Sequence, residues 1–112
     1  MSELSVILTA CPEANADSLA AYLVEGRFAA CVSALPGARS TYRWQDEVRR
    51  DAETLLLIKV PHAGLDDCIA ALEAIHPYAV PEIVVLPSER VNASYLAWAV
   101  AMTVGQPDTA PA

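Results

Sequence analysis

The pattern of apolar and polar positions along the chain predicts four strands and three helices. Short β-branched runs bounded by proline or turn residues are typical of strands, and apolar residues that recur every three or four positions are typical of helices. The predicted strands cover residues 4–10, 31–44, 48–60 and 82–87, and the predicted helices cover residues 12–28, 61–75 and 92–104.

Each of the first two predicted helices has one apolar stripe that we expect to face the core. The stripe of the first consists of Leu19, Ala20, Leu23, Val24 and Phe28, and that of the second consists of Leu65, Cys68, Ile69, Leu72 and Ile75. Asn92 is the expected N-cap of the third helix. The strand at 82–87 is apolar nearly throughout, which predicts a strand buried on both faces.

The second and third strands form a predicted long hairpin. Pro36-Gly37 interrupts the first of these strands, which indicates an edge position or a bulge. The tip, residues 42–51, is expected to project beyond the core. A protruding two-stranded arm is marginally stable alone, so we expect it to pack on something, such as another subunit.

The order β-α-β-β-α-β followed by a further helix matches the split-βαβ, ferredoxin-like motif of the α+β class. Such a sheet carries helices on one face only. Because 54% of the residues are hydrophobic, the bare face favours self-association. We expect one domain of residues 1–104 and a flexible tail of residues 105–112.

Composition narrows the classes of function. The 14 acidic and 7 basic residues give a charge of −7, which disfavours nucleic acid as a partner. The first residues lack a signal-peptide pattern, and no apolar run is long enough for a membrane span. Cys11, Cys31 and Cys68 are odd in number and contain no C-x-x-C pair, which favours a reducing, cytoplasmic setting. No catalytic motif or organic-cofactor motif is present, so we do not expect an enzyme.

The segment HPYAVPEIVVLP, residues 76–87, carries the main candidate chemistry. Pro77 and Pro81 stiffen it, and His76 and Glu82 flank the stiff corner. Imidazole and carboxylate groups both bind Cu(II) and Zn(II), and the thiolate of Cys31 is a candidate third ligand. The alternatives are a structural or interface hydrogen bond for His76 and Glu82, and a small buried apolar side chain for Cys31. Cys68 is expected to face the core, and Cys11 to lie in an accessible loop.

A second candidate group points to an anionic ligand in a cleft. Lys59 is the only lysine and interrupts an apolar run, so it either reaches solvent at a strand end or pairs with Glu82 or an anionic ligand. Arg39 is a further candidate for the anion. The aromatic residues with polar tips are typical of subunit interfaces and of pocket walls; they include Tyr42, Trp44, Tyr78 and Trp98.

Four segments together resemble the CutA divalent-cation tolerance family. They are AACVSALPGARSTYRW at 29–44, LLLIKV at 55–60, HPYAVPEI at 76–83 and YLAWA at 95–99. The resemblance implies a ferredoxin-like homotrimer whose hairpins embrace neighbouring subunits, and a link to metal tolerance with copper as the metal most often discussed. The tip sequence Trp44-Gln45-Asp46 departs from the family's usual Trp-Glu-Gly.

Three hypotheses follow. The first is a cytoplasmic homotrimer that binds divalent cations, copper above all, at His76, Glu82 and Cys31. The second is a trimer similar to the PII signal proteins, which binds a small anionic effector between subunits at Lys59 and Arg39. The third is a structural trimer that acts through protein partners.

Overall fold

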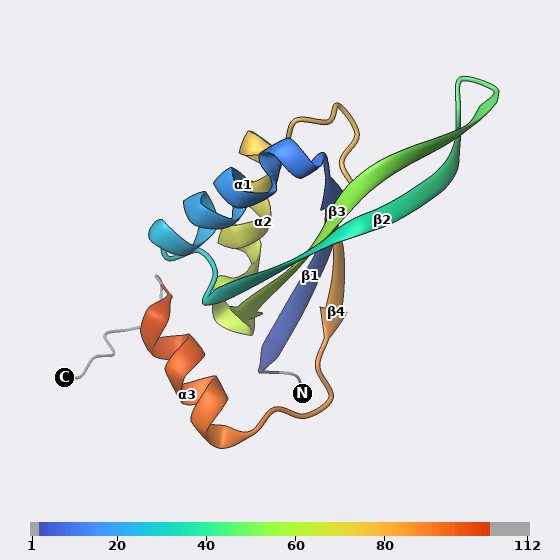
Figure 1. The fold of residues 1–112 in the computed structure, drawn as a ribbon. Helices are drawn as coiled ribbons and strands as arrows, with labels where there is room; N and C mark the ends of the chain where they lie inside the picture. Colours follow the sequence, from blue (N-terminus) through green and yellow to red (C-terminus); the bar gives the residue numbers. More distant parts are fainter. Residues whose placement is uncertain (1–2, 104–112) are drawn as a thin grey trace.

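The fold is a four-stranded antiparallel sheet with three helices (Figure 1), and the computed structural model describes residues 3–103. The elements are β1 (Leu4–Cys11), α1 (Glu13–Glu25), β2 (Cys31–Trp44), β3 (Glu47–Pro61), a 3-10 turn (His62–Gly64), α2 (Leu65–Ile75), β4 (Val84–Pro87) and α3 (Ala93–Met102). The predicted α+β class and the order of its elements are confirmed. The end of the predicted third helix at residue 104 and the predicted tail lie outside the described residues.

The strands lie in the order β2-β3-β1-β4, and every neighbouring pair is antiparallel. The long strand β3 pairs with β1 from Leu4↔Pro61 to Cys11↔Thr54, and β4 pairs with β1 from Ser5↔Pro87 to Leu8↔Val84. The two central strands are therefore the first and the third along the chain. This is the arrangement of the split-βαβ motif.

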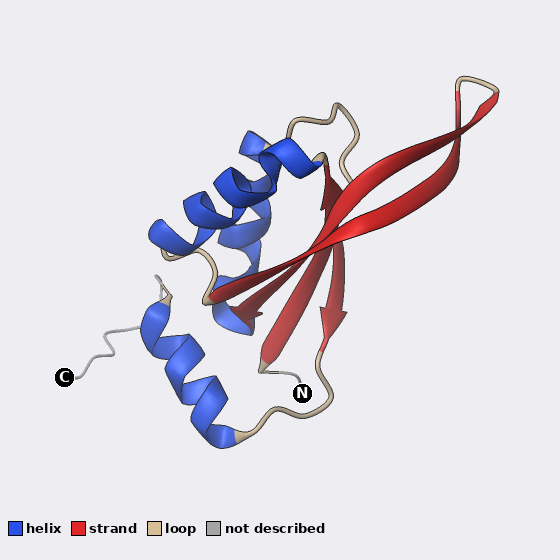
Figure 2. Ribbon diagram, viewed as in Figure 1, coloured by secondary structure: helices blue, strands red, loops and turns tan. Residues whose placement is uncertain are grey.

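The core lies between one face of the sheet and helices α1 and α2, which stand together on that side in Figure 2. Ile7, Leu56 and Ile58 from the strands are fully buried, as are Leu23 and Leu72 from the helices. The predicted inward stripes are largely right. Val24 is an exception, because its side chain is 40% exposed on the flank of α1.

Among residues 3–103, no helix covers most of the other face of the sheet, and this face is largely apolar. Directly paired residues of antiparallel strands project to the same face. The pairs Leu8↔Leu57, Leu8↔Val84 and Ser33↔Leu57 therefore form one cross-strand row on this open face. The next row contains Leu86, Val6, Lys59 and Cys31.

Strand β4 differs from the prediction of a strand buried on both faces. It pairs with β1 alone and forms one edge of the sheet, so Val84 and Leu86 are 44% and 45% exposed. An apolar run can equally belong to an edge strand whose open face is left for a partner. The apolar run alone does not distinguish these two cases.

Strands β2 and β3 continue past the rest of the sheet as a two-stranded arm (Figure 1). Their register shifts between Leu35 and Ala38, where Gly37 adopts a φ of 87°, so the break predicted at Pro36-Gly37 is a bulge. At the tip, Gln45 and Asp46 have φ values of 51° and 66°. Two successive positive values are typical of the type I′ turn, which matches the twist of a hairpin.

Helix α3 packs at one end of the sheet, where Ala99 contacts a small cluster that contains Leu4 and Ala30. Asn92 occupies the N-cap position, but its side chain does not bond to the helix backbone; its amide donates to Ser94 Oγ at 3.1 Å. Within residues 3–103, no helix has the length and the apolar character that a membrane crossing requires.

Candidate functional site

A pocket of about 580 Å³ lies between the arm and the segment that joins α2 to β4. The arm contributes Tyr42, Trp44 and two carboxylates, those of Asp51 and Glu53. The opposite wall contains Tyr78 and Glu82. The pocket thus combines aromatic rings with carboxylates.

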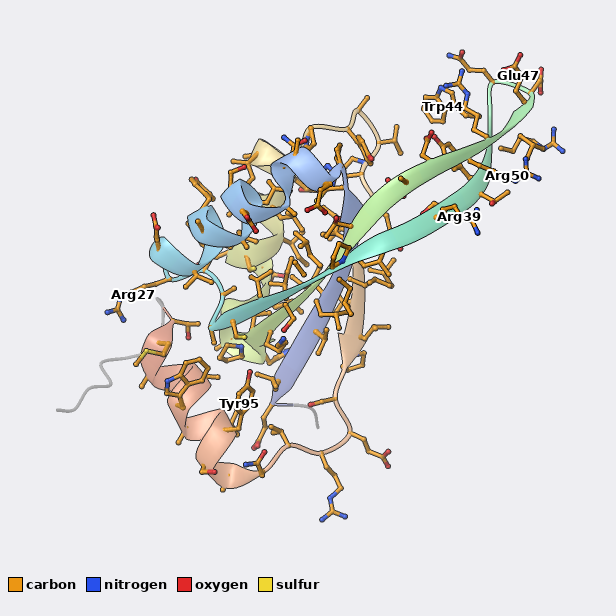
Figure 3. The ribbon with its side chains drawn as sticks, viewed as in Figure 1. Arg27, Arg39, Trp44, Glu47, Arg50 and Tyr95 are labelled. Atoms are coloured by element: carbon orange, nitrogen blue, oxygen red, sulfur yellow. The ribbon has the colours of Figure 1, made fainter. Side chains whose placement is uncertain are left out.

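The hairpin register determines which arm residues face this pocket. The pairs Tyr42↔Arg49, Ser40↔Asp51 and Ala38↔Glu53 each project to one face, because side chains alternate along a strand. The intervening positions hold three arginines, Arg39, Arg43 and Arg50, which project to the opposite face. Figure 3 shows Arg39 and Arg50 on the side of the arm away from Trp44. The arm therefore has an acidic, aromatic face and a basic face.

His76 lies behind the pocket wall and is only 8% exposed. Its Nε2 lies 3.0 Å from the carbonyl oxygen of Ala10 and 3.1 Å from Thr9 Oγ1, and its Nδ1 accepts the backbone N–H of Tyr78 at 3.2 Å. Burial lowers the pKa of His76, so the neutral ring is favoured. A metal ion would have to displace one of these hydrogen bonds to reach a ring nitrogen.

Two tyrosines donate hydrogen bonds to carboxylates of the pocket. Tyr78 donates its hydroxyl proton to Glu53 Oε2 at 2.6 Å, and Tyr42 donates to Asp51 Oδ2. Burial and the bond to Glu53 raise the pKa of Tyr78, and the bond to Asp51 raises that of Tyr42, because each carboxylate stabilises the protonated phenol. Both hydroxyls therefore stay protonated and continue to donate.

The pocket carries net negative charge. Three carboxylates line it, those of Asp51, Glu53 and Glu82, against the single guanidinium of Arg49. Three minus one leaves two uncompensated negative charges. Such a pocket attracts cations and repels anions.

The predicted site residues divide between this pocket and other places. Tyr42, Trp44, Tyr78 and Glu82 line the pocket, with His76 directly behind. The remaining four lie elsewhere: Cys31 and Lys59 are paired on the open face of the sheet, Arg39 is on the basic face of the arm, and Trp98 lines a separate shallow hollow beside α3. In the described part of the chain, no three His, Cys, Asp or Glu side chains form a group able to hold a metal ion.

Lys59 uses local partners instead of Glu82. Its Nζ donates to Ser33 Oγ at 2.6 Å and to the carbonyl oxygen of Leu57 at 3.4 Å. The ammonium is thus held against the open face of the sheet. No hydrogen bond joins Lys59 to Glu82 among the described residues.

The prediction that Cys11 lies in an accessible loop is wrong. Strand β1 extends to Cys11, whose side chain is fully buried in the core cluster. Burial raises the pKa of the Cys11 thiol, and the nearby Glu53 and Glu13 add to the effect. The prolonged pairing of β1 with β3, as far as Cys11↔Thr54, is the reason for the difference.

Asp51 and Glu53 were not predicted as site residues, although the signal was present in the sequence. A two-residue turn at Gln45-Asp46 fixes the hairpin register, and that register places every second residue of β3 on the face of Tyr42. Taking every second residue of β3 after the turn would have identified Arg49, Asp51 and Glu53.

Together the fold and the pocket define a class: a small α+β protein with a split-βαβ sheet and an acidic, aromatic pocket beside a long β-arm. The family model described as CutA1 divalent ion tolerance protein matches residues 5–102, and the chain belongs to this family. A curated relative from Thermus thermophilus, named Divalent-cation tolerance protein CutA, is 46% identical over 93 residues, which cover 83% of this chain and 90% of the relative.

Solved structures agree with this assignment. The divalent cation tolerance protein (Cut A1) of Thermus thermophilus superposes with a TM-score of 0.84 at 44% identity, covering 89% of this chain and 98% of that one. The PII-like protein CutA of Nostoc sp. PCC 7120, in apo form, superposes with a TM-score of 0.86 at 30% identity, covering 90% and 98%. The fold is therefore shared with proteins described both as ion-tolerance and as PII-like proteins.

Proposed function

We propose that this chain forms a cytoplasmic homotrimer that binds divalent cations and contributes to metal-ion tolerance without catalysing a reaction. Membership of the ion-tolerance family supports the role, and the excess of carboxylates in the pocket carries the proposal. Negatively charged, partly enclosed pockets concentrate cations from solution.

Carboxylate oxygens and retained water molecules would hold the ion in this pocket. Asp51 and Glu53 come from one wall and Glu82 from the other. Because residues 3–103 contain no cluster of three such ligands, the coordination sphere needs water or groups of another subunit. Copper is the metal we propose, and Cu(II) accepts carboxylate and imidazole ligands.

Two surfaces that the isolated chain leaves unpacked support the proposed trimer. Leu8, Leu57 and Val84 form an apolar row on the open sheet face, and the arm projects beyond the core. Apolar area removed from water contributes about 25 cal/mol per Å². A second and a third copy would cover both surfaces.

Calorimetric titration with Cu(II) and Zn(II), with chelator competition, tests the proposal. We expect binding to the wild type and a loss of at least tenfold in affinity in Asp51→Asn/Glu53→Gln, because neutral amides bind divalent cations less strongly than carboxylates. Asp66→Asn/Glu89→Gln makes the same change in net charge on exposed residues elsewhere and should bind like the wild type. Equal affinity in both double variants would contradict the pocket assignment, and a monomeric mass in light scattering would contradict the trimer.

A second candidate, a small anionic effector as in PII-like signalling, is favoured by the PII-like structural relative and by the basic face of the arm. Binding of an effector and binding of a metal ion would depend on different residues. Effector binding should weaken in Arg39→Gln and Lys59→Gln, and metal binding should not. A purely structural trimer would show neither dependence.

A further inference from the structure

The pairing of strand β3 changes on both of its sides at Thr54, where the arm begins (Figure 1). On one side, the ladder with β1 ends at the pair Cys11↔Thr54. On the other side, the shift of register places Pro36 and Gly37 of β2 together opposite Thr54. Two residues opposite one make a β-bulge, which bends its strand and increases the local twist. We call Thr54, the adjacent Glu53 and this bulge the arm root.

Gly37 meets a requirement of the bulge that concerns the backbone alone. Its φ of 87° lies in the left-handed region, which side chains disfavour and glycine adopts freely. A Cβ at this position would meet no atom within 4 Å, so space does not explain the glycine. The sequence therefore specifies the bend itself.

Strand β3 is held from both faces at the arm root. Thr54 Oγ1 donates a hydrogen bond to the carboxylate of Glu13 at the start of α1, and Glu53 Oε2 accepts one from Tyr78 at 2.6 Å. Adjacent residues of a strand project to opposite faces, so these two bonds hold β3 from opposite sides. Thr54 is 1% exposed and Glu53 is 9% exposed, and polar groups buried to this degree need their partners.

We propose that the arm root positions the arm for assembly. The bulge sets the angle at which the arm leaves the sheet, and the bonds of Thr54 and Glu53 hold that angle. Glu13 begins α1 and Tyr78 follows α2, so the arm is oriented relative to both helices. An arm held in its bound direction loses less conformational entropy when it meets a second copy of the chain. The inference rests on the proposed homotrimer, and it adds the residues that direct the arm.

Distance measurement between two spin labels by double electron–electron resonance tests this proposal. The labels are attached at Glu47→Cys near the tip and at Ala70→Cys on the exposed side of α2, in the full chain with Cys31→Ser. Cys11 and Cys68 are fully buried and should not be labelled. Refolding with excess unlabelled chain gives trimers with one labelled subunit. The arm extends about 20 Å beyond the bulge, so a change of about 20° in its direction moves the tip by about 7 Å.

We expect one narrow distance distribution when the arm root is intact. Deletion of Gly37 removes the extra residue and keeps the pairs on both sides of the bulge, so the mean distance should shift by several Å. Thr54→Val/Tyr78→Phe removes both hydroxyls with little change in shape, and the distribution should broaden to include distances several Å from the original mean. Tyr22→Phe/Thr41→Val makes the same chemical changes on exposed residues and should leave the distribution unchanged.

An unchanged distance after deletion of Gly37, or an unchanged distribution in Thr54→Val/Tyr78→Phe, would overturn the proposal. The double variant keeps every backbone pair, so it decides the question if the deletion does not fold. Light scattering of the same samples separates this inference from the proposed trimer. A trimeric mass with unchanged distances rejects the role of the arm root alone, whereas a monomeric wild type rejects the trimer itself.

Discussion

The Nε2 atom of His76 lies 3.0 Å from the carbonyl oxygen of Ala10, and this contact fixes the protonation of the ring. A carbonyl oxygen only accepts, so Nε2 carries the proton, and Nδ1 is left to accept the backbone N–H of Tyr78. The same ring thereby connects the end of β1 to the pocket wall. Tyr78 in turn donates to Glu53, so the corner at His76-Pro77-Tyr78 positions a pocket carboxylate.

Protonation of His76 should destabilise the fold. Burial lowers its pKa below the ordinary value of 6.5, so the unfolded chain binds the proton more readily. The contribution of the neutral ring is complete above pH 6.5 and decreases as the pH falls toward the lowered folded pKa. Urea unfolding between pH 7.5 and 5 at fixed protein concentration would measure this, and we expect the decline to shrink in His76→Gln.

The other histidine provides the control for this experiment. His62 is exposed in the 3-10 turn before α2, and His62→Gln should leave the pH dependence of the wild type unchanged. At pH 7.5, His76→Gln should also lose about 1–3 kcal/mol of unfolding free energy, because buried backbone groups lose well-placed partners. A pH profile identical in wild type and His76→Gln would refute the assigned role of the ring.

Removal of the Tyr78 hydroxyl should leave the Glu53 carboxylate without its hydrogen bond. We expect Tyr78→Phe to reduce the free energy of unfolding at pH 7 by about 1–2 kcal/mol, since a hydrogen bond to a charged group is lost. Tyr22→Phe is the matched control, because Tyr22 is 47% exposed and its ring stacks on Phe28. Equal effects of both substitutions would speak against the bond to Glu53.

Much of the fold could be predicted because local signals and tertiary packing agree. The stripe that contains Leu19 and Leu23 and the stripe that contains Cys68 and Leu72 are buried as the periodicity indicated. The positions that differ, Val24 and the strand β4, lie where a side chain borders the core or where a strand forms an edge. Hydrophobic pattern alone does not distinguish a buried strand from an edge strand.

The candidate site was less predictable, because it depends on strand pairing at long sequence separation. Tyr78 and Glu53 are 25 residues apart, and the HPY corner alone does not indicate its partner on the arm. The sequence singled out Tyr42, Trp44 and Tyr78, which line the pocket, but it grouped them with Cys31 and Lys59, which the register places on the open face of the sheet.

The two buried cysteines should be inert in the native protein. Burial raises the pKa of Cys68 to about 11 and also raises that of Cys11, and both side chains are fully buried. The thiolate is the reactive form, so modification requires opening of the core. In Cys31→Ser, an aromatic disulfide reagent at pH 8 should detect no thiol in the native state and two in denaturant. Rapid native labelling of either thiol would contradict the burial of Cys11 and Cys68.

Arg27 occupies a backbone position that favours glycine. Helix α1 ends with Phe28 N–H bonded to the Leu23 carbonyl at 2.9 Å and Arg27 N–H bonded to the Val24 carbonyl at 3.0 Å, the pattern of a Schellman motif. Its left-handed residue is Arg27, with a φ of 63°, and not the glycine that precedes it.

Replacement of Arg27 should therefore stabilise the protein, and replacement of Gly26 should not. Arg27→Gly relieves a left-handed side-chain strain of about 1–2 kcal/mol and loses roughly 0.5–1 kcal/mol in backbone entropy, so we expect a net gain of up to about 1.5 kcal/mol. In Gly26→Ala the new Cβ would lie 2.8 Å from Phe28 Cε2 and 3.1 Å from the Tyr22 carbonyl oxygen, so we expect a loss. Urea unfolding of both variants measures the two signs. A destabilised Arg27→Gly would mean that the guanidinium makes a contact in the assembled protein that outweighs the strain.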